Sequence, residues 1–547
     1  MKKRHSLPES NPLVSYLAQK PETNKSVAPL PEKKLVPITF PTKHDPKVLL
    51  VNPPMCIPVG QPKRCIQPSA ISYIGGYLRS VNIKVELLDC IIAGWKDEKL
   101  ADPENEIYIY GMSDAALKKY LVESQPDIIG ISITFSQDLN NVYNIAAIAK
   151  KCLPDTIIIV GGLHPTIYPE KTITNSVTDG PPNIDYILRG EGEKRLAEFV
   201  FNYKNGVIDK NADGLVGIFD DELVINPEIN KIQNLDELPL PAYDLLPMDD
   251  YFKIDMPCNC FPSGKKTIAI HTSRGCPIGC TFCSSTNFNY KFRTHSPQRV
   301  YDEIKYYIDT YGVDEVQFLD DNLLLNSRRA GEIFDIIKPL NIKWCTPNGT
   351  MVDSWKPHLM DKAIESGMYQ VTLALDGLSE ESHKISGKPV HIDSLPAKID
   401  SFRAKNILVH GFVVVGIPGE TAENILKGFE WLKTLNFTSV SIYIAQPYPG
   451  SILYETELSK GNIAAEDGTR VVKTKSTIAN MEVDGEFLEQ QVRKFTIDYE
   501  KIMKDRETDL WNDRYENKLK RFKDITQHLI IGQGDRINML LDNEKSA

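Results

Sequence analysis

Three closely spaced cysteines are the strongest chemical signal in the sequence. They follow the pattern C-x3-C-x2-C and are Cys276, Cys280 and Cys283. Cysteine thiolates are the usual ligands of iron–sulfur clusters, and a four-iron cluster normally binds four of them. Three thiolates on one loop would therefore leave one iron open to a small molecule. Gly275 and Gly279 favour this arrangement, because glycine lets a loop wrap tightly around a compact group.

Two alternatives for these cysteines stay open at this point. A structural zinc site needs four closed ligands, and Cys258 and Cys260 could help to supply them. The cysteines could also be buried without any ligand. The spacing, and the position directly after an apolar run at residues 267–270, favour the iron–sulfur cluster over both alternatives.

Two stretches of alternating strands and helices must position such a site. In the first, short apolar runs predict strands at residues 48–51, 85–88, 128–133, 157–160 and 186–188. Helices are expected between them, where Val142, Ile145 and Ala149, for example, recur at helical spacing. Short apolar strands separated by helices predict a parallel sheet covered on both faces. Five such units predict a flavodoxin-like, doubly wound α/β domain at residues 46–204, with its ligand site beyond the carboxyl ends of the strands.

The second stretch follows an irregular segment, residues 205–262, whose prolines predict a linker with a small hairpin. Strands are then expected at residues 267–270, 315–319, 342–345, 370–375, 408–415 and 439–444. Six βα units predict a partial (β/α)6 barrel at residues 263–460, with its chemistry at the C-terminal ends of the strands. The three cysteines directly follow the first of these strands, which places them at that end of the barrel.

The two ends of the chain differ in pattern. Residues 1–45 are rich in Pro, Lys, Ser and Asn and have no apolar period, so they predict a mobile tail. Residues 461–547 predict a mainly helical extension. One helix face is formed there by apolar residues at spacings of four and three, namely Leu488, Val492, Phe495, Tyr499 and Ile502.

Composition limits the location and the partners. The 547 residues have a formal net charge of −10, which disfavours a broad phosphate-binding surface for nucleic acid. No run approaches the ~20 apolar residues that span a bilayer, so no transmembrane segment is expected. The basic N-terminus is not followed by the apolar segment of a secretory signal. Ten cysteines are too sparse for a disulfide scaffold, and we therefore expect a cytoplasmic protein.

The cysteine pattern, with Phe282 before the last cysteine, resembles the signature of radical S-adenosylmethionine (SAM) enzymes. The resemblance implies a [4Fe-4S] cluster whose open iron binds the amino and carboxylate groups of SAM. In that family one electron from the cluster breaks a carbon–sulfur bond of SAM and gives a 5′-deoxyadenosyl radical. The resemblance also implies an electron donor such as flavodoxin or ferredoxin.

Motifs after four later strands are similar to the SAM contacts of this family. Each alone is no more than a helix cap or a turn, but they occur in order at the ends of successive strands. The resemblance, which covers residues 262–455, implies SAM contacts from Phe282, Asp320, Asp321, Asn348, Asp376, Gly416, Pro418, Gly419 and Glu420. Many relatives carry Glu-Ser where this chain has Asp376 and Gly377.

Four segments of the N-terminal domain carry a second resemblance: residues 51–54, 67–79, 161–166 and 189–193. With them the domain resembles the cobalamin-binding domain that precedes the barrel in many radical SAM enzymes. The resemblance implies cobalamin contacts from Pro53, Pro54, Ser132, Gly161, Gly162, His164, Pro165 and Glu191. The motif Asp-x-His-x-x-Gly, whose His ligates cobalt in other cobalamin enzymes, does not occur. His164 follows the fourth strand and not the first, so we do not expect it to ligate cobalt. The alternative for Gly161 and Gly162 is a tight turn that binds nothing.

Both resemblances together imply a cobalamin-dependent methyltransferase that acts on an unactivated carbon of a small molecule or of a natural-product or lipid intermediate. One alternative keeps the radical but catalyses cyclisation, rearrangement or oxidation. A zinc-stabilised binding protein without catalysis is an alternative of another class. Methylthiotransferases of transfer RNA are disfavoured, because the remaining N-terminal cysteines lie far apart and the charge is acidic. Tyr443, Gln446, Tyr448 and the C-terminal helix are candidates for the substrate pocket.

Overall fold

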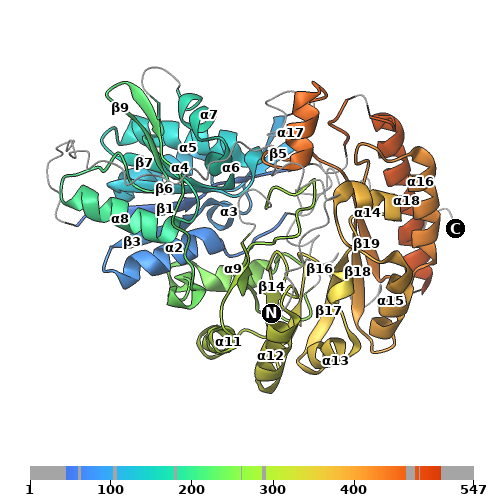
Figure 1. Ribbon diagram of the computed structural model, residues 1–547. Coiled ribbons are helices and arrows are strands. Elements are labelled where there is room, and N and C mark those ends of the chain that lie inside the picture. The colour runs from blue at the N-terminus through green and yellow to red at the C-terminus, as the bar shows by residue number, and fades with distance from the viewer. Residues whose placement is uncertain are drawn as a thin grey trace, which may run out of the picture.

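The computed structural model describes residues 45–58, 63–102, 107–177, 182–259, 262–285, 291–463, 475–479 and 481–506. In Figure 1 the N-terminal half, blue to green, lies beside the C-terminal half, yellow to red. The predicted tail at residues 1–45, apart from Asp45, lies outside the described residues, as do Cys260 and much of the C-terminal extension.

Seven strands form the N-terminal sheet, in the order β10-β9-β8-β7-β6-β1-β3. Their bounds are β1 Val48–Asn52, β3 Val85–Asp89, β6 Ile128–Ile133, β7 Ile157–Gly162, β8 Tyr186–Leu188, β9 Leu215–Phe219 and β10 Glu222–Ile225. The strands from β3 to β8 are parallel, and their order is that of a flavodoxin-like sheet. This confirms the predicted fold. The strand order reverses between β1 and β6. Doubly wound sheets bind their ligands at this switch point.

Helices cover both faces of this sheet, which agrees with the nearly continuous burial of its central strands. Leu49 faces a core that contains α4 Asp114–Ser124 and α5 Leu139–Cys152, whereas Leu50 faces α2 Ser69–Ser80 and α8 Gly192–Lys204. Because side chains of a strand alternate between faces, one apolar run serves both cores. The shorter helices of this domain are α3 Cys90–Ala93, α6 Leu163–Ile167 and α7 Pro169–Thr174.

The hairpin predicted within residues 205–262 is formed by β9 and β10. It does not stand free in a linker: β9 pairs antiparallel with β8 and so extends the N-terminal sheet. Asp220 and Asp221 both have positive φ at its turn, which suits the twist of a two-residue hairpin. The chain then continues to α9 Met248–Ile254, which lies between the two halves (Figure 1).

A small antiparallel sheet, in the order β2-β5-β4, was not expected from the sequence. Its strands are β2 Met55–Pro58, β4 Glu98–Asp102 and β5 Ile107–Tyr110. They are short, and β4 mixes charged and apolar residues, so no period of two stands out. The sheet follows the carboxyl end of β1 and adds a wall to the ligand side of the domain.

Six parallel strands form the predicted partial barrel, in the order β11-β14-β15-β17-β18-β19. They are β11 Thr267–Ile270, β14 Glu315–Phe318, β15 Lys343–Cys345, β17 Met368–Ala374, β18 Leu408–Val415 and β19 Ser439–Ile444, and β16 Thr350–Met351 pairs with β17. The surrounding helices are α11 Pro297–Tyr311, α12 Ser327–Ile337, α13 Pro357–Glu365, α14 Glu380–Ser386, α15 Leu395–Arg403, α16 Ala422–Thr434 and α17 Ile452–Ser459.

The helix predicted near the C-terminus is α18 Gly485–Arg506, which packs beside β19 and α16. Its buried residues are Leu488, Val492, Phe495, Tyr499 and Met503. The pattern therefore ends on Met503, and the predicted Ile502 is only half-buried. Phe495 stacks between Phe429 and Tyr499 at ring distances of 4.8 and 5.3 Å.

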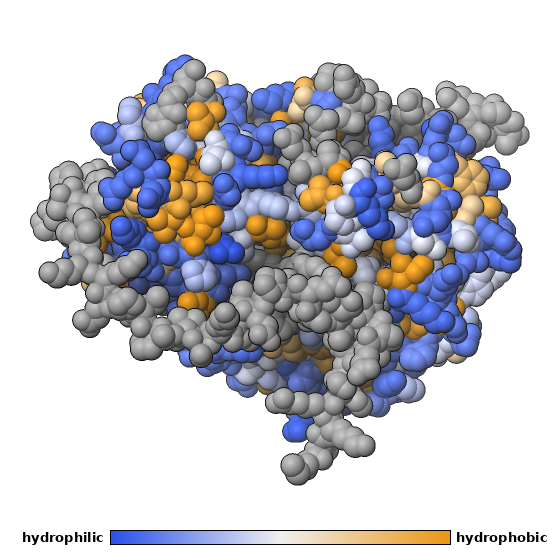
Figure 2. Space-filling model, turned by 45° about the horizontal axis from the view of Figure 1, so that its top comes forward, coloured by the Kyte–Doolittle hydropathy of each residue, from blue (hydrophilic) through white to orange (hydrophobic). Residues whose placement is uncertain are grey.

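On the face drawn in Figure 2, hydrophobic residues form separate patches, the largest over the N-terminal half. Within the described ranges, none of the helices carries an apolar stretch long enough to cross a bilayer.

Candidate functional site

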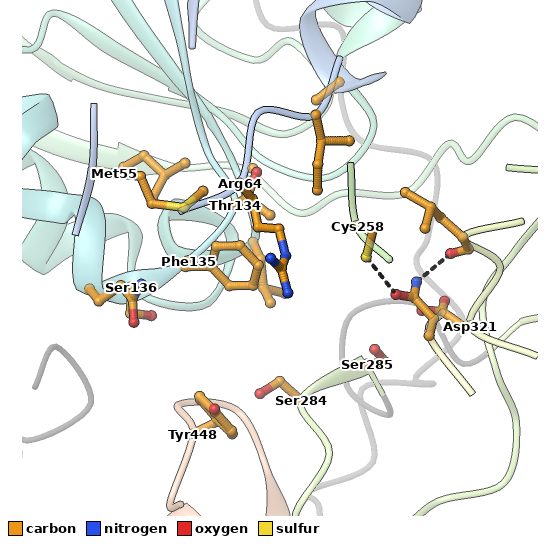
Figure 3. Close-up of a pocket in the computed structure, with 18 of the residues that line it drawn as sticks. Met55, Arg64, Thr134, Phe135, Ser136, Cys258, Ser284, Ser285, Asp321 and Tyr448 are labelled. Carbon is orange, nitrogen blue, oxygen red and sulfur yellow. Dashed lines mark hydrogen bonds between the residues drawn. The ribbon is translucent and has the colours of Figure 1, made fainter. Parts of the chain in front are cut away.

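A cavity of about 2330 Å³ lies between the carboxyl edge of the N-terminal sheet and the mouth of the barrel. Figure 3 shows Met55, Arg64 and Phe135 of the N-terminal domain facing Ser284 and Asp321 of the barrel domain across this space. Both ligand-binding ends predicted from the strand patterns therefore open into one cavity.

The cysteine loop leaves β11 and is held from two sides. Thr281 N donates to Ser386 O at the end of α14 (2.9 Å), and Leu453 N in α17 donates to Thr281 O (2.8 Å). Gly275 and Gly279 have φ of 92° and 79°, values that favour glycine. The loop can therefore turn sharply on each side of Cys276.

The three thiols fit an iron–sulfur cluster in their chemistry. Burial raises the pKa of Cys276, Cys280 and Cys283, and Cys283 raises the pKa of its two neighbours further because like charges repel. The positive charge of an iron–sulfur cluster core would offset the negative charge of three neighbouring thiolates. In the part of the chain that the structure describes, no three His, Cys, Asp or Glu side chains are grouped as ligands of a single metal ion. A cuboidal cluster makes a different demand, because each thiolate binds its own iron.

The zinc alternative finds no such ligand group among these residues. Cys260, one of its proposed ligands, lies outside them. Cys258 lies on the cavity wall with its Sγ 4.0 Å from Asn348 Oδ1 (Figure 3). Asn348 in turn donates to Leu319 O at 2.7 Å.

The two aspartates after β14 occupy different environments. Asp320 is buried and accepts hydrogen bonds from Thr272 Oγ1 (2.7 Å) and from the Ser273 hydroxyl, so it anchors the start of the cysteine loop. Asp321 accepts from Gly275 N (3.2 Å) and lines the cavity. The predicted contact with SAM therefore stays a proposal for Asp321, whereas Asp320 is already committed to the loop.

Asp376 forms an ion pair that the sequence did not reveal. Its carboxylate contacts Lys388 Nζ, and both side chains are largely buried. Burial raises the pKa of the Cys280 thiol, and the charge of Lys388 opposes that increase. Lys388 follows a helix and not a strand, so no motif pointed to it.

The turn after β18 is built by its own glutamate. Glu420 accepts from Gly416 N (2.6 Å) and Ile417 N (3.0 Å), and Glu482 accepts from Gly419 N (2.8 Å). Ile417 packs in a small core with Phe282. The Gly416–Glu420 turn, including Pro418, therefore lies behind the cysteine loop. Its residues are not part of the cavity wall.

On the opposite wall, Ser132, Gly161 and Gly162 lie at the carboxyl edge of the sheet. A side chain at Gly162 would place its Cβ 2.2 Å from Ile133 O, and its φ of 113° favours glycine. Gly161 and Gly162 leave a ledge of backbone without side chains that a large flat ligand could approach closely. The cavity volume and this ledge fit cobalamin.

Four other predicted cobalamin contacts are absent from the cavity wall: Pro53, Pro54, His164 and Pro165. His164 is buried, and its Nδ1 lies 2.9 Å from Ser136 Oγ. Burial lowers the pKa of this imidazole to about 4. Glu191 does line the cavity, but its carboxylate is bound by Arg274 and Arg293 of the barrel domain.

Arg64, which the sequence analysis missed, projects into the cavity beside Phe135 (Figure 3). Its Nη1 is buried and has no hydrogen-bond partner within the described ranges. It lies in an irregular segment between β2 and α2, where no strand or helix pattern marks it.

The barrel interior below the cysteine loop is polar. Its cavity-lining side chains include Gln370, Thr372, His410, Ser439, Ser441 and Tyr443. His410 lies 2.6 Å from Ser439 Oγ and 3.2 Å from Ser441 Oγ, and burial lowers its pKa to about 4. The lumen therefore offers neutral hydrogen-bonding groups at neutral pH. Tyr443 and Tyr448 line the cavity as expected, whereas Gln446 is buried against Lys475 O.

Comparison with known proteins explains this geometry. A model of the Radical SAM superfamily matches residues 270–432, and a model of the B12 binding domain matches residues 55–200. An uncharacterized methyltransferase of Pyrococcus horikoshii is 31% identical over 419 residues, which are 75% of this chain and 82% of that protein. The chain belongs to the radical SAM superfamily, with a B12 binding domain in front of the barrel.

Two further proteins resemble most of the chain. Cytidylyl-2-hydroxyethylphosphonate methyltransferase of Streptomyces wedmorensis is 29% identical over 489 residues, 84% of this chain and 90% of that protein. The structure of the cobalamin-dependent SAM radical enzyme OxsB, with aqua-cobalamin and SAM bound, has the same fold with a TM-score of 0.63 at 17% identity. The match covers 82% of this chain and 66% of that one. The protein is thus a radical SAM enzyme whose cofactors are a [4Fe-4S] cluster, SAM and cobalamin.

Proposed function

We propose that this enzyme transfers a methyl group to an unactivated carbon of a polar small molecule. When bound, the cluster and SAM supply a hydrogen-abstracting radical, and cobalamin supplies a methyl group. The observation that carries the proposal is the shared cavity of about 2330 Å³, which the cysteine loop and the carboxyl edge of the sheet both face. A substrate carbon between the two walls would be within reach of both reagents.

The chain's own residues would bind and orient these groups. Cys276, Cys280 and Cys283 would hold the cluster, and Asp321 and Asn348, which line the cavity after neighbouring strands, would contact SAM. The glycine ledge on the opposite wall would receive the flat face of cobalamin. Enclosure between two domains would exclude water, which protects a reactive radical.

The polar lumen supports a substrate with hydrogen-bonding groups over a pure hydrocarbon. His410, Ser441 and Tyr443 reach the cavity from β18 and β19. Polar groups of this kind discriminate strongly, because a ligand that fails to pair them leaves them unsatisfied. The relative from Streptomyces wedmorensis, whose named substrate is cytidylyl-2-hydroxyethylphosphonate, provides a polar compound for a first assay.

The test is an anaerobic assay of the reconstituted enzyme with that compound and then with other polar candidates. A true substrate should yield S-adenosylhomocysteine and 5′-deoxyadenosine together, along with a product heavier by one CH2 group. Consumption of a substrate with deoxyadenosine alone would replace methyl transfer by cyclisation, rearrangement or oxidation.

The proposal includes an electron donor such as flavodoxin or ferredoxin, because the cluster must be reduced before each cleavage. It also includes a cytoplasmic location. Cys65, Cys90 and Cys345 are buried as free thiols, which supports a reducing environment.

A further inference from the structure

Four charged side chains join the N-terminal sheet to the start of the cysteine loop. We call them the interdomain clamp: Glu191 and Glu193 from the end of β8 and the start of α8, and Arg274 and Arg293 from the barrel domain. The two arginines belong to a two-stranded ribbon, β12 Ser273–Arg274 and β13 Arg293–Thr294. Residues from distant parts of the chain are therefore held by direct ion pairs.

The contacts of Glu191 use all of its acceptor capacity. Oε1 accepts from Arg274 Nη1 (3.0 Å) and Arg293 Nη2 (2.8 Å), and Oε2 accepts from Arg293 Nη1 (2.8 Å) and Ile232 N (2.9 Å). A carboxylate has about four acceptor positions. Glu191 therefore has none left for a cofactor, although it lines the cavity.

Glu193 completes the pairing of Arg274, accepting from its Nη2 at 2.6 Å. The clamp is shielded from water: the side chains of Arg293 and Glu193 are only 3% and 5% exposed. Burial alone would raise the pKa of Glu191, but hydrogen bonds from Arg293 and the charge of Arg274 lower it to about 2. Glu191 is thus charged at neutral pH, and removing one of its partners leaves a buried charge without compensation.

The clamp connects directly to the cluster ligands. Arg274 lies two residues before Cys276, and Gly275 between them donates its N–H to Asp321. The Arg274 guanidinium also lies 5.3 Å from the ring of Tyr73 in α2. The beginning of the cysteine loop is therefore fixed against the N-terminal domain as well as against its own barrel.

We propose that Glu191 and Glu193 are positioning residues, which hold the cysteine loop at a set distance from the carboxyl edge of the N-terminal sheet, and that Glu191 does not bind cobalamin. The inference rests on the proposed function in one respect, because methyl transfer needs both cofactors to face one substrate carbon. The pairing of the domains itself does not depend on the reaction.

The experiment compares anaerobically reconstituted wild-type enzyme with Glu191→Gln and Glu193→Gln. Glutamine keeps the shape but removes the charge. The matched control is Glu237→Gln, because Glu237 pairs with Lys194 at 3.3 Å with both side chains about half exposed. Cobalamin and iron contents are measured by absorbance and metal analysis, and domain docking by hydrogen exchange of the peptides that contain β12, β13 and the end of β8.

We expect Glu191→Gln to retain wild-type cobalamin and iron contents while exchange in these peptides becomes at least about tenfold faster, because local opening loses its main ionic restraint. Glu237→Gln should match the wild type. Loss of cobalamin with unchanged exchange would show that Glu191 is a cofactor ligand and would overturn the proposal.

If Glu191→Gln folds poorly, Glu193→Gln carries the test, because it removes only the contact of Glu193 with Arg274 and should also speed exchange in these peptides. If Glu191→Gln folds, Arg293→Gln and the double variant Glu191→Gln/Arg293→Gln complete a double-mutant cycle, in which paired groups give non-additive effects. In the double variant, the acceleration of hydrogen exchange should be smaller than the product of the accelerations in the two single variants. If the free-energy effects of the two substitutions were additive, Glu191 and Arg293 would not act as a pair, and the proposed clamp would be wrong. If methyl transfer is correct as well, Glu191→Gln should also raise the ratio of deoxyadenosine to S-adenosylhomocysteine; an unchanged ratio with faster exchange would count against the proposed reaction alone.

Discussion

At the scale of single residues, the cysteine loop shows how far spacing alone can predict chemistry. Cys276, Cys280 and Cys283 are close in sequence, so a short loop must bring them together whatever the rest of the chain does. The contacts that hold this loop in place could not be predicted from spacing. Lys388 and Glu191 come from separate segments, and their roles became visible only where the fold placed them beside Asp376 and Arg274.

We expect Cys276→Ala to abolish SAM cleavage, because two thiolates cannot hold the cluster with one open iron. Iron content and deoxyadenosine formation in the anaerobically reconstituted variant are the measurements. Cys152→Ala is the matched control, since Cys152 lies in α5 away from the cavity wall, and it should retain both. Full cleavage by the Cys276 variant would contradict the ligand assignment.

At the scale of elements, α18 stabilises the open side of the barrel through one apolar face. Its hydrophobic period was readable in the sequence, because a helix that buries one face must repeat at about 3.6 residues. The partners of that face were not readable. Phe429 of α16 and the edge strand β19 come from other βα units, and only the order of the barrel strands places them beside the helix.

Phe495→Ala should destabilise the C-terminal half by about 3–5 kcal/mol, the usual cost of removing a buried phenyl ring. Urea unfolding followed by circular dichroism measures the change. Lys494→Ala is the control on the same helix, because Lys494 is exposed and should move the midpoint little. Equal shifts for the two variants would mean that α18 does not pack through its apolar face.

At the scale of the whole molecule, the two halves are connected at more places than the clamp. Gln67 Nε2 donates to Thr267 O (3.3 Å), and Tyr243 OH donates to Ala269 O (3.3 Å). One hydrophobic core runs from the α2 and α8 face of the N-terminal sheet into the barrel. The cavity is therefore the gap left between two docked domains, with a shape set by their contacts.

The contribution of the clamp to stability should depend on pH. The pKa of Glu191 is lowered in the folded protein from 4.5 to about 2, so its stabilisation is complete above 4.5 and is lost as the pH falls toward 2. That difference corresponds to about 3 kcal/mol. The wild type should unfold at a higher temperature than Glu191→Gln near pH 7, and the gap between the two midpoints should close between pH 4.5 and 2. A gap independent of pH would mean that the carboxylate charge is not what stabilises the docking.

The sequence by itself determined the two α/β domains and the order of the parallel strands in each, and it predicted the cysteine ligands, because these depend on local periodicity and on residues close along the chain. Tertiary structure alone decided that Asp320 anchors a loop, that Glu191 holds two arginines of the other domain, and that Arg64 reaches the cavity. Contacts of this kind join residues far apart in the chain, and their geometry depends on how the two sheets dock. No spacing within one segment encodes that docking.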